Sequence, residues 1–206
     1  MPGPEHHFLI NPFGLAFEEV TASNLVKVDL DGNIIGASPY PINAAGFTIH
    51  SAVHAARPEV GCVIHLHTEA GMALSMLEGG LLPLSQTAMF FQRQLAFHDY
   101  EGIALDLAER ERLVRDLGDK AVMILRNHGT LVASPSIGRA FVTMFLLEKA
   151  ARAQLRAMAC GGKLAEASTQ AVDITAQFGK SGGGGAEYAW AAMLRRLDRA
   201  DPSYKN

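Results

Sequence analysis

The chain alternates between short apolar runs and longer segments that carry apolar and polar residues in helical patterns. The short runs have the length and aliphatic content of buried strands, and they occupy residues 7–10, 61–64, 121–125 and 129–133. Residues 25–36 read as a hairpin, because two β-prone stretches flank the turn pair Asp31-Gly32. The pattern therefore predicts a sheet of short strands mixed with helices.

Helices are expected over residues 47–56, 70–77, 105–117, 134–158, 164–178 and 187–197. The longest of them should open at Ser134-Pro135, which supplies a capping side chain and a proline at the first helical position. Residues 179–206 are expected to form a separate C-terminal part, in which Ser181 and the following glycines make a flexible break before the last helix.

The composition indicates one folded domain over residues 1–206, because 49% hydrophobic and 19% charged content over 206 residues is enough for a substantial core. The net charge of −3 and the absence of a Lys/Arg cluster argue against a nucleic-acid surface. The apolar runs are too short for membrane insertion. Cys62 and Cys160 lack any paired spacing, which favours free thiols and a cytoplasmic protein.

Three histidines are the most informative residues for function. His65 and His67 end one apolar run, and residues two apart on an extended segment point to the same side. His128 follows the run at 121–125 and directly precedes Gly129, where the chain must turn. Three neutral imidazoles around Zn²⁺ or a similar ion leave a position open, as in catalytic metal sites. The alternative is that each histidine is simply packed and hydrogen-bonded at a strand end.

His50 and His54 lie four apart on a predicted helix, the spacing of helical zinc sites of the His-Glu-x-x-His type. Ser51 stands where that motif has its glutamate. We therefore interpret this pair as packing at the helix surface or between the helix and the sheet, and not as a metal site.

Several separated motifs recur together in one known family. They are Asn43 to Val60, Cys62 to Thr68, Gly80 to Gln86, His98 to Gly102, and Arg126 to Gly129. In this order they resemble the class II aldolase/adducin family, and most closely its adducin-like branch. The resemblance covers about residues 8–160.

This resemblance implies an α/β fold with three layers, α/β/α, around a central mixed and mainly antiparallel sheet. It also implies a divalent transition metal, usually Zn²⁺, held by His65, His67 and His128. Family members act on small molecules and often form homotetramers with active sites at subunit interfaces. A homotetramer and a small-molecule substrate are accordingly expected here.

The chain also departs from the family pattern. Family aldolases that act on sugar phosphates carry a catalytic glutamate four residues before the position that His50 matches, and this chain has Gly46 there. Two phosphate-binding serines correspond to Ala44 and Ala45, whose methyl groups cannot hydrogen-bond an anion. The family's N-terminal helix and first strand are expected to be missing. A phosphorylated substrate is therefore not expected.

Other residues are candidates for the remaining roles. Glu69 and Tyr100 can supply the proton transfer that Gly46 cannot, although Glu69 also suits the first turn of a helix and Tyr100 could simply be packed. Substrate contacts are assigned to Asn11, Gly14 and Asn43, with turn geometry as the alternative for Asn11 and Gly14.

The leading hypothesis is a divalent-metal-dependent, aldolase-like lyase that acts on a small non-phosphorylated carbonyl or carboxylate compound through a metal-stabilised enediolate. Decarboxylation and epimerisation follow the same logic. The alternative is a non-catalytic, adducin-like module for binding or assembly, which Gly46 favours and the three histidines oppose.

Overall fold

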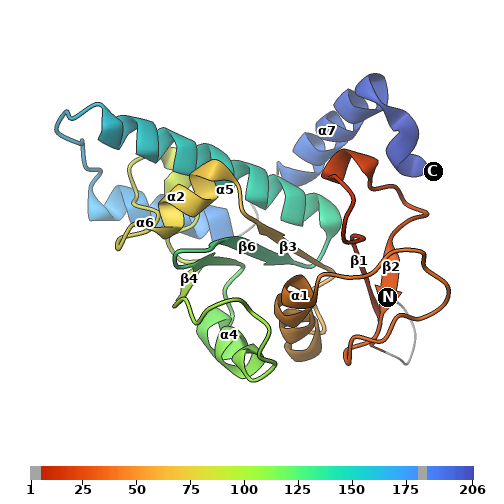
Figure 1. Cartoon of the computed structure of the whole chain (residues 1–206). Helices are drawn as coiled ribbons and strands as arrows, with labels where there is room; N and C mark the ends of the chain where they lie inside the picture. Colours follow the sequence, from red (N-terminus) through yellow and green to blue (C-terminus); the bar gives the residue numbers. More distant parts are fainter. Residues whose placement is uncertain (1–5, 181–184) are drawn as a thin grey trace.

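A four-stranded sheet forms the centre of the computed structural model, which describes residues 6–180 and 185–206 (Figure 1). Its strands, in spatial order, are β3 (Cys62–Leu66), β6 (Gly129–Ser134), β5 (Val122–Leu125) and β4 (Leu95–His98). The pairs β3/β6 and β6/β5 are antiparallel, whereas β5/β4 is parallel. The predicted mixed and mainly antiparallel sheet is therefore confirmed.

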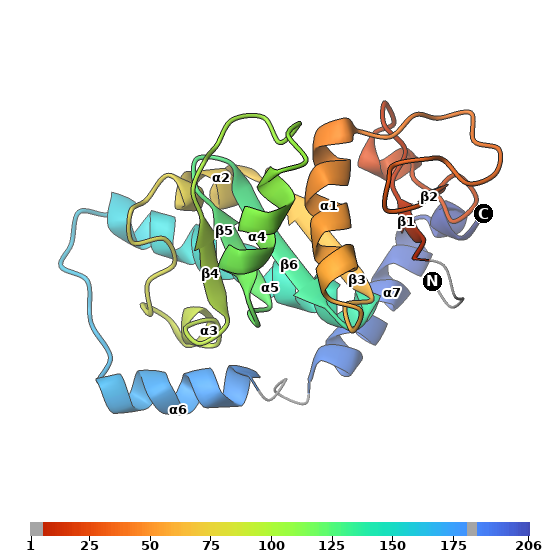
Figure 2. The same cartoon turned by 90° about the horizontal axis from the view of Figure 1, so that it is seen from below.

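Helices cover both faces of this sheet, which confirms the predicted three layers (Figures 1 and 2). On one face lie α1 (Ala44–Ala56) and α4 (Glu109–Leu117). On the other face lie α2 (Glu69–Ser75), α3 (Gln86–Met89) and α5 (Ile137–Ala159). The observed α4 begins at Glu109 and not at residue 105, because residues 99–108 form a connecting loop.

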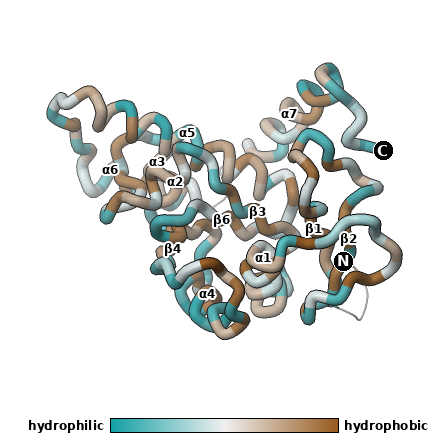
Figure 3. The backbone as a smooth tube through the Cα atoms, in the orientation of Figure 1, coloured by the Kyte–Doolittle hydropathy of each residue, from teal (hydrophilic) through white to brown (hydrophobic). Residues whose placement is uncertain are grey.

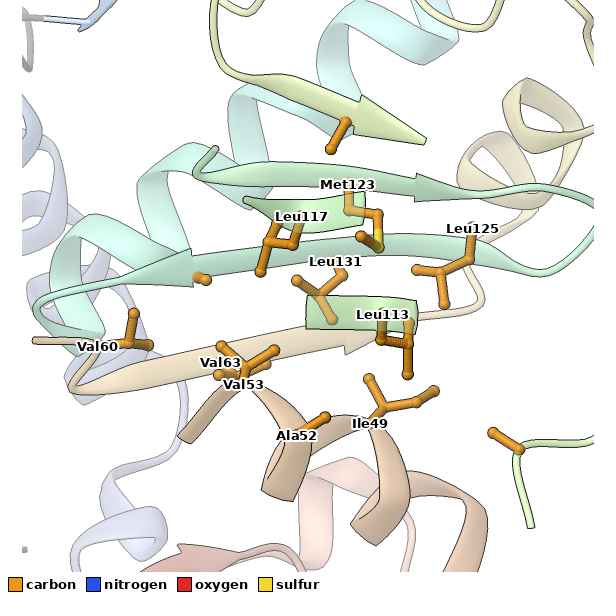
Figure 4. Packing of buried hydrophobic residues seen from close by; sticks show 13 residues of the cluster. Ile49, Ala52, Val53, Val60, Val63, Leu113, Leu117, Met123, Leu125 and Leu131 are labelled. Atoms are coloured by element: carbon orange, nitrogen blue, oxygen red, sulfur yellow. The ribbon is translucent and has the colours of Figure 1, made fainter. Parts of the chain in front are cut away.

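The central strands bury side chains on both faces because neighbouring residues of a strand point in opposite directions. In β5, Met123 and Leu125 join the cluster beneath α1 and α4 (Figure 4). Val122 and Ile124 point the other way and join the cluster beneath α2 and α5. Figure 3 shows the hydropathy of each residue along the backbone, and hydrophilic residues are prominent along α4.

A second, two-stranded sheet pairs β1 (Phe8–Ile10) with β2 (Val26–Val28). The hairpin predicted over residues 25–36 is correct only in part, because the main partner of β2 is β1. The returning segment makes one isolated bridge, between Val28 and Ile34. Asp29 accepts hydrogen bonds from the amides of Asp31 and Asn33 and so closes the turn. A short 3₁₀ helix, η1 (Phe17–Glu19), separates the two strands.

The long helix α5 begins later than its sequence suggests. Ser134 is the last residue of β6 and pairs with Cys62, so the strand retains it. The capping side chain is that of Ser136, whose hydroxyl accepts a hydrogen bond from the amide of Arg139. The predicted cap at Ser134 was therefore wrong by two residues.

The C-terminal part contains α6 (Thr169–Lys180), α7 (Ala186–Ala200) and the 3₁₀ turn η2 (Pro202–Lys205). The predicted break at Ser181 and its glycines falls largely outside the described residues. Within the described ranges, no helix is long and apolar enough to cross a membrane. Cys62 and Cys160 are free, as predicted.

Candidate metal centre

The sheet topology brings the three histidines together. His65 is in β3 and His67 follows the end of that strand, whereas His128 directly precedes β6. Because β3 and β6 are antiparallel and Leu66 pairs with Thr130, the end of β3 lies beside the start of β6. Side chains that are far apart in sequence thus meet at one edge of the central sheet.

The three imidazoles converge through their Nε2 atoms. Nε2 of His65 lies 2.9 Å from Nε2 of His67 and 3.3 Å from Nε2 of His128. One ring nitrogen from each histidine lies within 4.8 Å of the other two. Two nitrogens bound to one tetrahedral Zn²⁺ at 2.0–2.1 Å would be roughly 3.3 Å apart. The donor set and its spacing therefore fit a divalent transition metal.

The carbonyl oxygen of Thr130 fixes the tautomer of His65. It lies 3.0 Å from Nδ1 of His65, so Nδ1 carries the proton and donates it in this hydrogen bond. Nε2 then presents its lone pair toward His67 and His128. A backbone acceptor on the outer nitrogen is the usual second-shell support of a metal-binding histidine.

The site also disfavours protonation of its histidines. Burial, reinforced by the neighbouring His128 and His67, lowers the pKa of His65 to about 3. Burial and the charge of His67 lower the pKa of His128 as well. A metal ligand must be a neutral imidazole, so this environment keeps both side chains ready to bind at neutral pH.

His128 is held in place by the turn between β5 and β6. Its amide donates to the hydroxyl of Ser75, and the amide of Asn127 donates to the carbonyl of Ser75, each at 3.1 Å. Asn127 has φ +56°, the left-handed region that asparagine tolerates better than most residues. A Cβ atom on Gly129 would come within 2.4 Å of the Leu66 carbonyl oxygen. Asn127 and Gly129 therefore both suit the conformation of the turn that carries His128.

One side of the site is open. His65 and His128 are partly buried and His67 is exposed. The ring of Tyr100 meets His128 edge-on, with 6.2 Å between the ring centroids. The structure therefore places Tyr100 beside His128, and its role in proton transfer stays a prediction.

Comparison with known proteins decides the family. The sequence model of the Class II Aldolase and Adducin N-terminal domain matches residues 2–155. The chain belongs to this family. A crystal structure of an aldolase II superfamily protein from Pseudomonas syringae is 47% identical, covers 100% of this chain and 83% of its own, and has a TM-score of 0.94.

Two further relatives carry the names of an aldolase and an adducin. An L-fuculose 1-phosphate aldolase from Glaciozyma antarctica PI12 is 30% identical, with a TM-score of 0.82 over 98% of this chain and 78% of its own. Alpha-adducin from Rattus norvegicus is 46% identical over 77% of this chain, which spans 22% of the adducin. The aldolase/adducin domain described here is thus related to both.

Glu69 and Asn43 are two further predicted site residues of this aldolase/adducin domain. Glu69 is the first residue of α2 and is exposed, with Thr68 as the cap of that helix. Within residues 6–180 and 185–206, no hydrogen bond or ion pair joins Glu69 to the three histidines. Asn43 caps α1, and its side-chain oxygen accepts from the amides of Ala45 and Gly46. The catalytic role of Glu69 and the substrate role of Asn43 remain predictions.

Asn11 and Gly14 follow β1. Asn11 is exposed and lines a cleft of about 570 Å³ that His50 and His54 also line. Gly14 has φ +97° and a free approach on its Cβ side. The geometry at Gly14 suits a turn. Within the described residues, neither Asn11 nor Gly14 contacts the three histidines. Their role in substrate binding therefore stays a prediction.

His50 and His54 do not join the metal centre. The ring of His54 stacks on Phe8, with centroids 4.9 Å apart. Burial, with a smaller contribution from His54, lowers the pKa of His50 to about 4. Within the described residues, His65, His67 and His128 are the one group of metal-binding side chains with suitable spacing. The contact of His54 with Phe8 agrees with the packing predicted for this pair.

Sequence reasoning missed three supporting residues. Thr130 acts through its backbone carbonyl, and Ser75 is the last residue of α2, so neither carries a recognisable motif. Asn127 lies in the motif Arg126 to Gly129, and an asparagine between two strands favours a turn because it tolerates left-handed backbone. That signal could have identified it.

Proposed function

We propose that this domain is a divalent-metal-dependent, aldolase-like lyase that acts on a small non-phosphorylated carbonyl or carboxylate compound. The observation that carries this proposal is the convergence of three Nε2 atoms, with the proton of His65 directed away toward Thr130. Such a constellation matches a catalytic metal site, in which three protein ligands leave at least one position open.

The three imidazoles would hold the ion and orient it toward the open side of the site. A bound divalent metal would act as a Lewis acid on a substrate oxygen and stabilise the negative charge that develops there. Tyr100 stands beside His128 and offers a hydroxyl that can donate or accept a proton. Glu69 is the second candidate for proton transfer, because it lies two residues after His67.

The N-terminus of α1 supports a substrate without phosphate. Ala44 and Ala45 offer no hydroxyl group there. The amides of Ala45 and Gly46, which an anion would otherwise use, already bond to the side-chain oxygen of Asn43. We therefore place this domain apart from the phosphate specificity that the name of the Glaciozyma antarctica relative states.

The proposal includes Zn²⁺ as the metal, a homotetramer and a cytoplasmic location. Support for assembly comes from the loop after Tyr100, which exposes three large apolar side chains: Ile103 at 73%, Leu105 at 61% and Leu107 at 53%. Exposed apolar side chains gathered in one loop are suited to an interface with another copy of the chain.

A second candidate is an adducin-like binding module without catalysis. It is favoured by Gly46, which leaves no carboxylate at that position, and by the 46% identity with alpha-adducin. Loss of a general base typically forfeits on the order of 10²- to 10⁴-fold in rate. The binding module requires no metal, whereas the lyase does.

Activity assays on metal-loaded and chelator-treated protein distinguish the two candidates. A panel of non-phosphorylated 3-hydroxy carbonyl compounds and 3-oxo acids would be incubated with each form, and aldehyde, ketone or carbon dioxide release would be measured. The lyase predicts turnover that disappears with chelation and returns with Zn²⁺, and that falls in Tyr100→Phe. Metal-loaded protein without turnover of any compound would favour the binding module.

A further inference from the structure

In the motif His98-Asp99-Tyr100-Glu101, Tyr100 lies beside the metal centre, whereas His98 and Glu101 do not contact it. Tyr100 is 53% exposed, so few contacts of its own fix its position. His98 lies two residues before it and Glu101 directly after it, and both bind to α4. Asp99, which stands between His98 and Tyr100, pairs with Arg126. The position of Tyr100 must therefore depend on what holds these two neighbours.

His98 is buried between β4 and α4, with only 3% of its surface exposed. Its Nδ1 atom lies 2.8 Å from a carboxylate oxygen of Asp116, and its Nε2 atom lies 3.4 Å from a carboxylate oxygen of Glu109. Glu109 is itself 6% exposed. The hydrogen bond between His98 and Asp116 is strong because little water competes for it, whereas Nε2 of His98 has no hydrogen-bond partner within the described residues.

Glu101 is held from the same helix. Arg112 binds its carboxylate through Nε and Nη2, at distances of 2.5–2.8 Å. This two-point geometry fixes the direction of the carboxylate as well as its distance. Glu109, Arg112 and Asp116 are spaced three and four residues apart, so they lie along one face of α4.

We propose that α4 positions Tyr100 by clamping His98 and Glu101. The clamp consists of Arg112 and Asp116, and Glu109 lies beside the buried ring of His98. It sets the distance between the Tyr100 hydroxyl and the three imidazoles, which the loop alone would leave variable. His98 is a positioning residue, because it acts through Tyr100 and touches none of the metal ligands. The role of this clamp in catalysis rests on the proposed lyase activity. The effect of α4 on the position of the loop does not depend on that activity.

Fluorine NMR can measure the position of Tyr100 directly. The full chain would be labelled with 3-fluorotyrosine, which gives one signal for each of its four tyrosines, and Tyr100→Phe identifies the signal of interest. Co²⁺ is the probe, since a paramagnetic ion shifts a nearby fluorine strongly with distance. In the unaltered chain we expect the Tyr100 signal to shift most on Co²⁺ loading.

The test compares Arg112→Gln and His98→Asn with the control Glu111→Gln, a matched change at an exposed position of the same helix. Both clamp variants should keep about one Co²⁺ per chain and lose about half or more of the Tyr100 shift, because positioning in such sites is sensitive to about 1 Å. Arg112 is at the surface, so its variant decides the matter even if His98→Asn fails to fold. An unchanged shift in Arg112→Gln would overturn the clamp.

Amide hydrogen exchange of residues 99–104 gives a second readout that needs no metal. The clamp predicts exchange at least about tenfold faster in Arg112→Gln than in Glu111→Gln, because the loop loses an anchor. Equal rates would overturn the clamp. If the unaltered chain binds no Co²⁺, the proposed metal-dependent function fails, and the exchange rates still decide whether α4 clamps the loop.

Discussion

The carbonyl oxygen of Thr130 lies 3.0 Å from Nδ1 of His65, on the side of the ring that faces away from the other two histidines. This contact assigns the proton of His65 to Nδ1 and leaves Nε2 as the ligand atom. The acceptor is a backbone atom of β6, so the register between β3 and β6 sets the tautomer. The same register places His128 opposite, which couples the fold of the sheet directly to the metal centre.

Ser75 supports His128 through two hydrogen bonds, one to its own amide and one to that of Asn127. The variant Ser75→Ala removes the hydroxyl and leaves the His128 amide with only its second acceptor, the carbonyl oxygen of Leu125. We expect metal affinity to fall about 10- to 100-fold, as for other second-shell losses. Stability should fall by about 1–2 kcal/mol. Isothermal titration and denaturant unfolding would measure both.

Ser51→Ala is the matched control, because Ser51 is also buried in a helix and its hydroxyl bonds to a carbonyl of its own helix. It should leave metal affinity unchanged. Equal losses of metal affinity in the two variants would contradict a specific role for Ser75.

Asn127 occupies left-handed backbone space at φ +56°. A β-branched residue is strained there, so Asn127→Val should destabilise the chain by about 1–3 kcal/mol and weaken metal binding. Asn127→Gly tolerates this conformation and should stay close to the parent in both measurements. Thermal unfolding monitored by circular dichroism would separate them. A valine variant as stable as the glycine variant would show that the turn does not need this conformation.

Acid should destabilise the metal-free protein through His50. Burial lowers the pKa of His50 to about 4 in the folded chain, below its ordinary value of 6.5. As the pH falls through this interval, the unfolded chain binds a proton that the folded chain rejects, so the free energy of unfolding decreases. One such proton corresponds to a slope of about 1.4 kcal/mol per pH unit at most.

Above pH 6.5 this contribution should be constant. His50→Gln should reduce the slope between pH 6.5 and 4, to which the lowered pKa values of His65 and His128 also contribute, whereas His6→Gln, at an exposed position, should leave it unchanged. Urea unfolding at several pH values would test this. A slope that His50→Gln leaves unchanged would place the acid sensitivity elsewhere in the chain.

Gly46 lies in the first turn of α1, and a Cβ atom there would meet its nearest neighbours at 3.8 Å. Gly46→Glu should therefore fit. It should stabilise the helix by about 1 kcal/mol, because it replaces a glycine and adds a negative charge near the helix N-terminus. Gly46→Gln shares the first effect and lacks the charge.

If the missing carboxylate limits catalysis, Gly46→Glu should also raise turnover by about 10²-fold or more, and Gly46→Gln should not. Steady-state rates on a substrate found with the panel would measure this. Equal rates in Gly46→Glu and the parent would indicate that another group, such as Tyr100, already performs the proton transfer.

The sequence predicted the fold and the three histidines because their signals are local or carried by family motifs. Short aliphatic runs mark β5 and β6, and the His-x-His spacing marks the end of β3. The resemblance supplied the order of layers, which no local pattern contains. The convergence of His128 with His65 depends on strand pairing, so spacing alone left it open.

The errors arise from competition between neighbouring elements, and the omissions arise from contacts between distant segments. Ser134 has the residue type of a helix cap, but its backbone pairs with Cys62 in the sheet. Residues 33–36 look like a strand, but β1 pairs with β2 instead. The contacts of Ser75 and His98 join segments that are distant in sequence, and a single sequence holds no record of such pairs.

The central claim is that His65, His67 and His128 hold one divalent metal ion. Elemental analysis of protein purified without added metal or an affinity tag tests it most directly, alongside His65→Ala and the control His54→Ala. The account predicts about one ion per chain in the unaltered protein and in His54→Ala, and its loss in His65→Ala. Protein that is metal-free and cannot be reloaded with Zn²⁺ would contradict it.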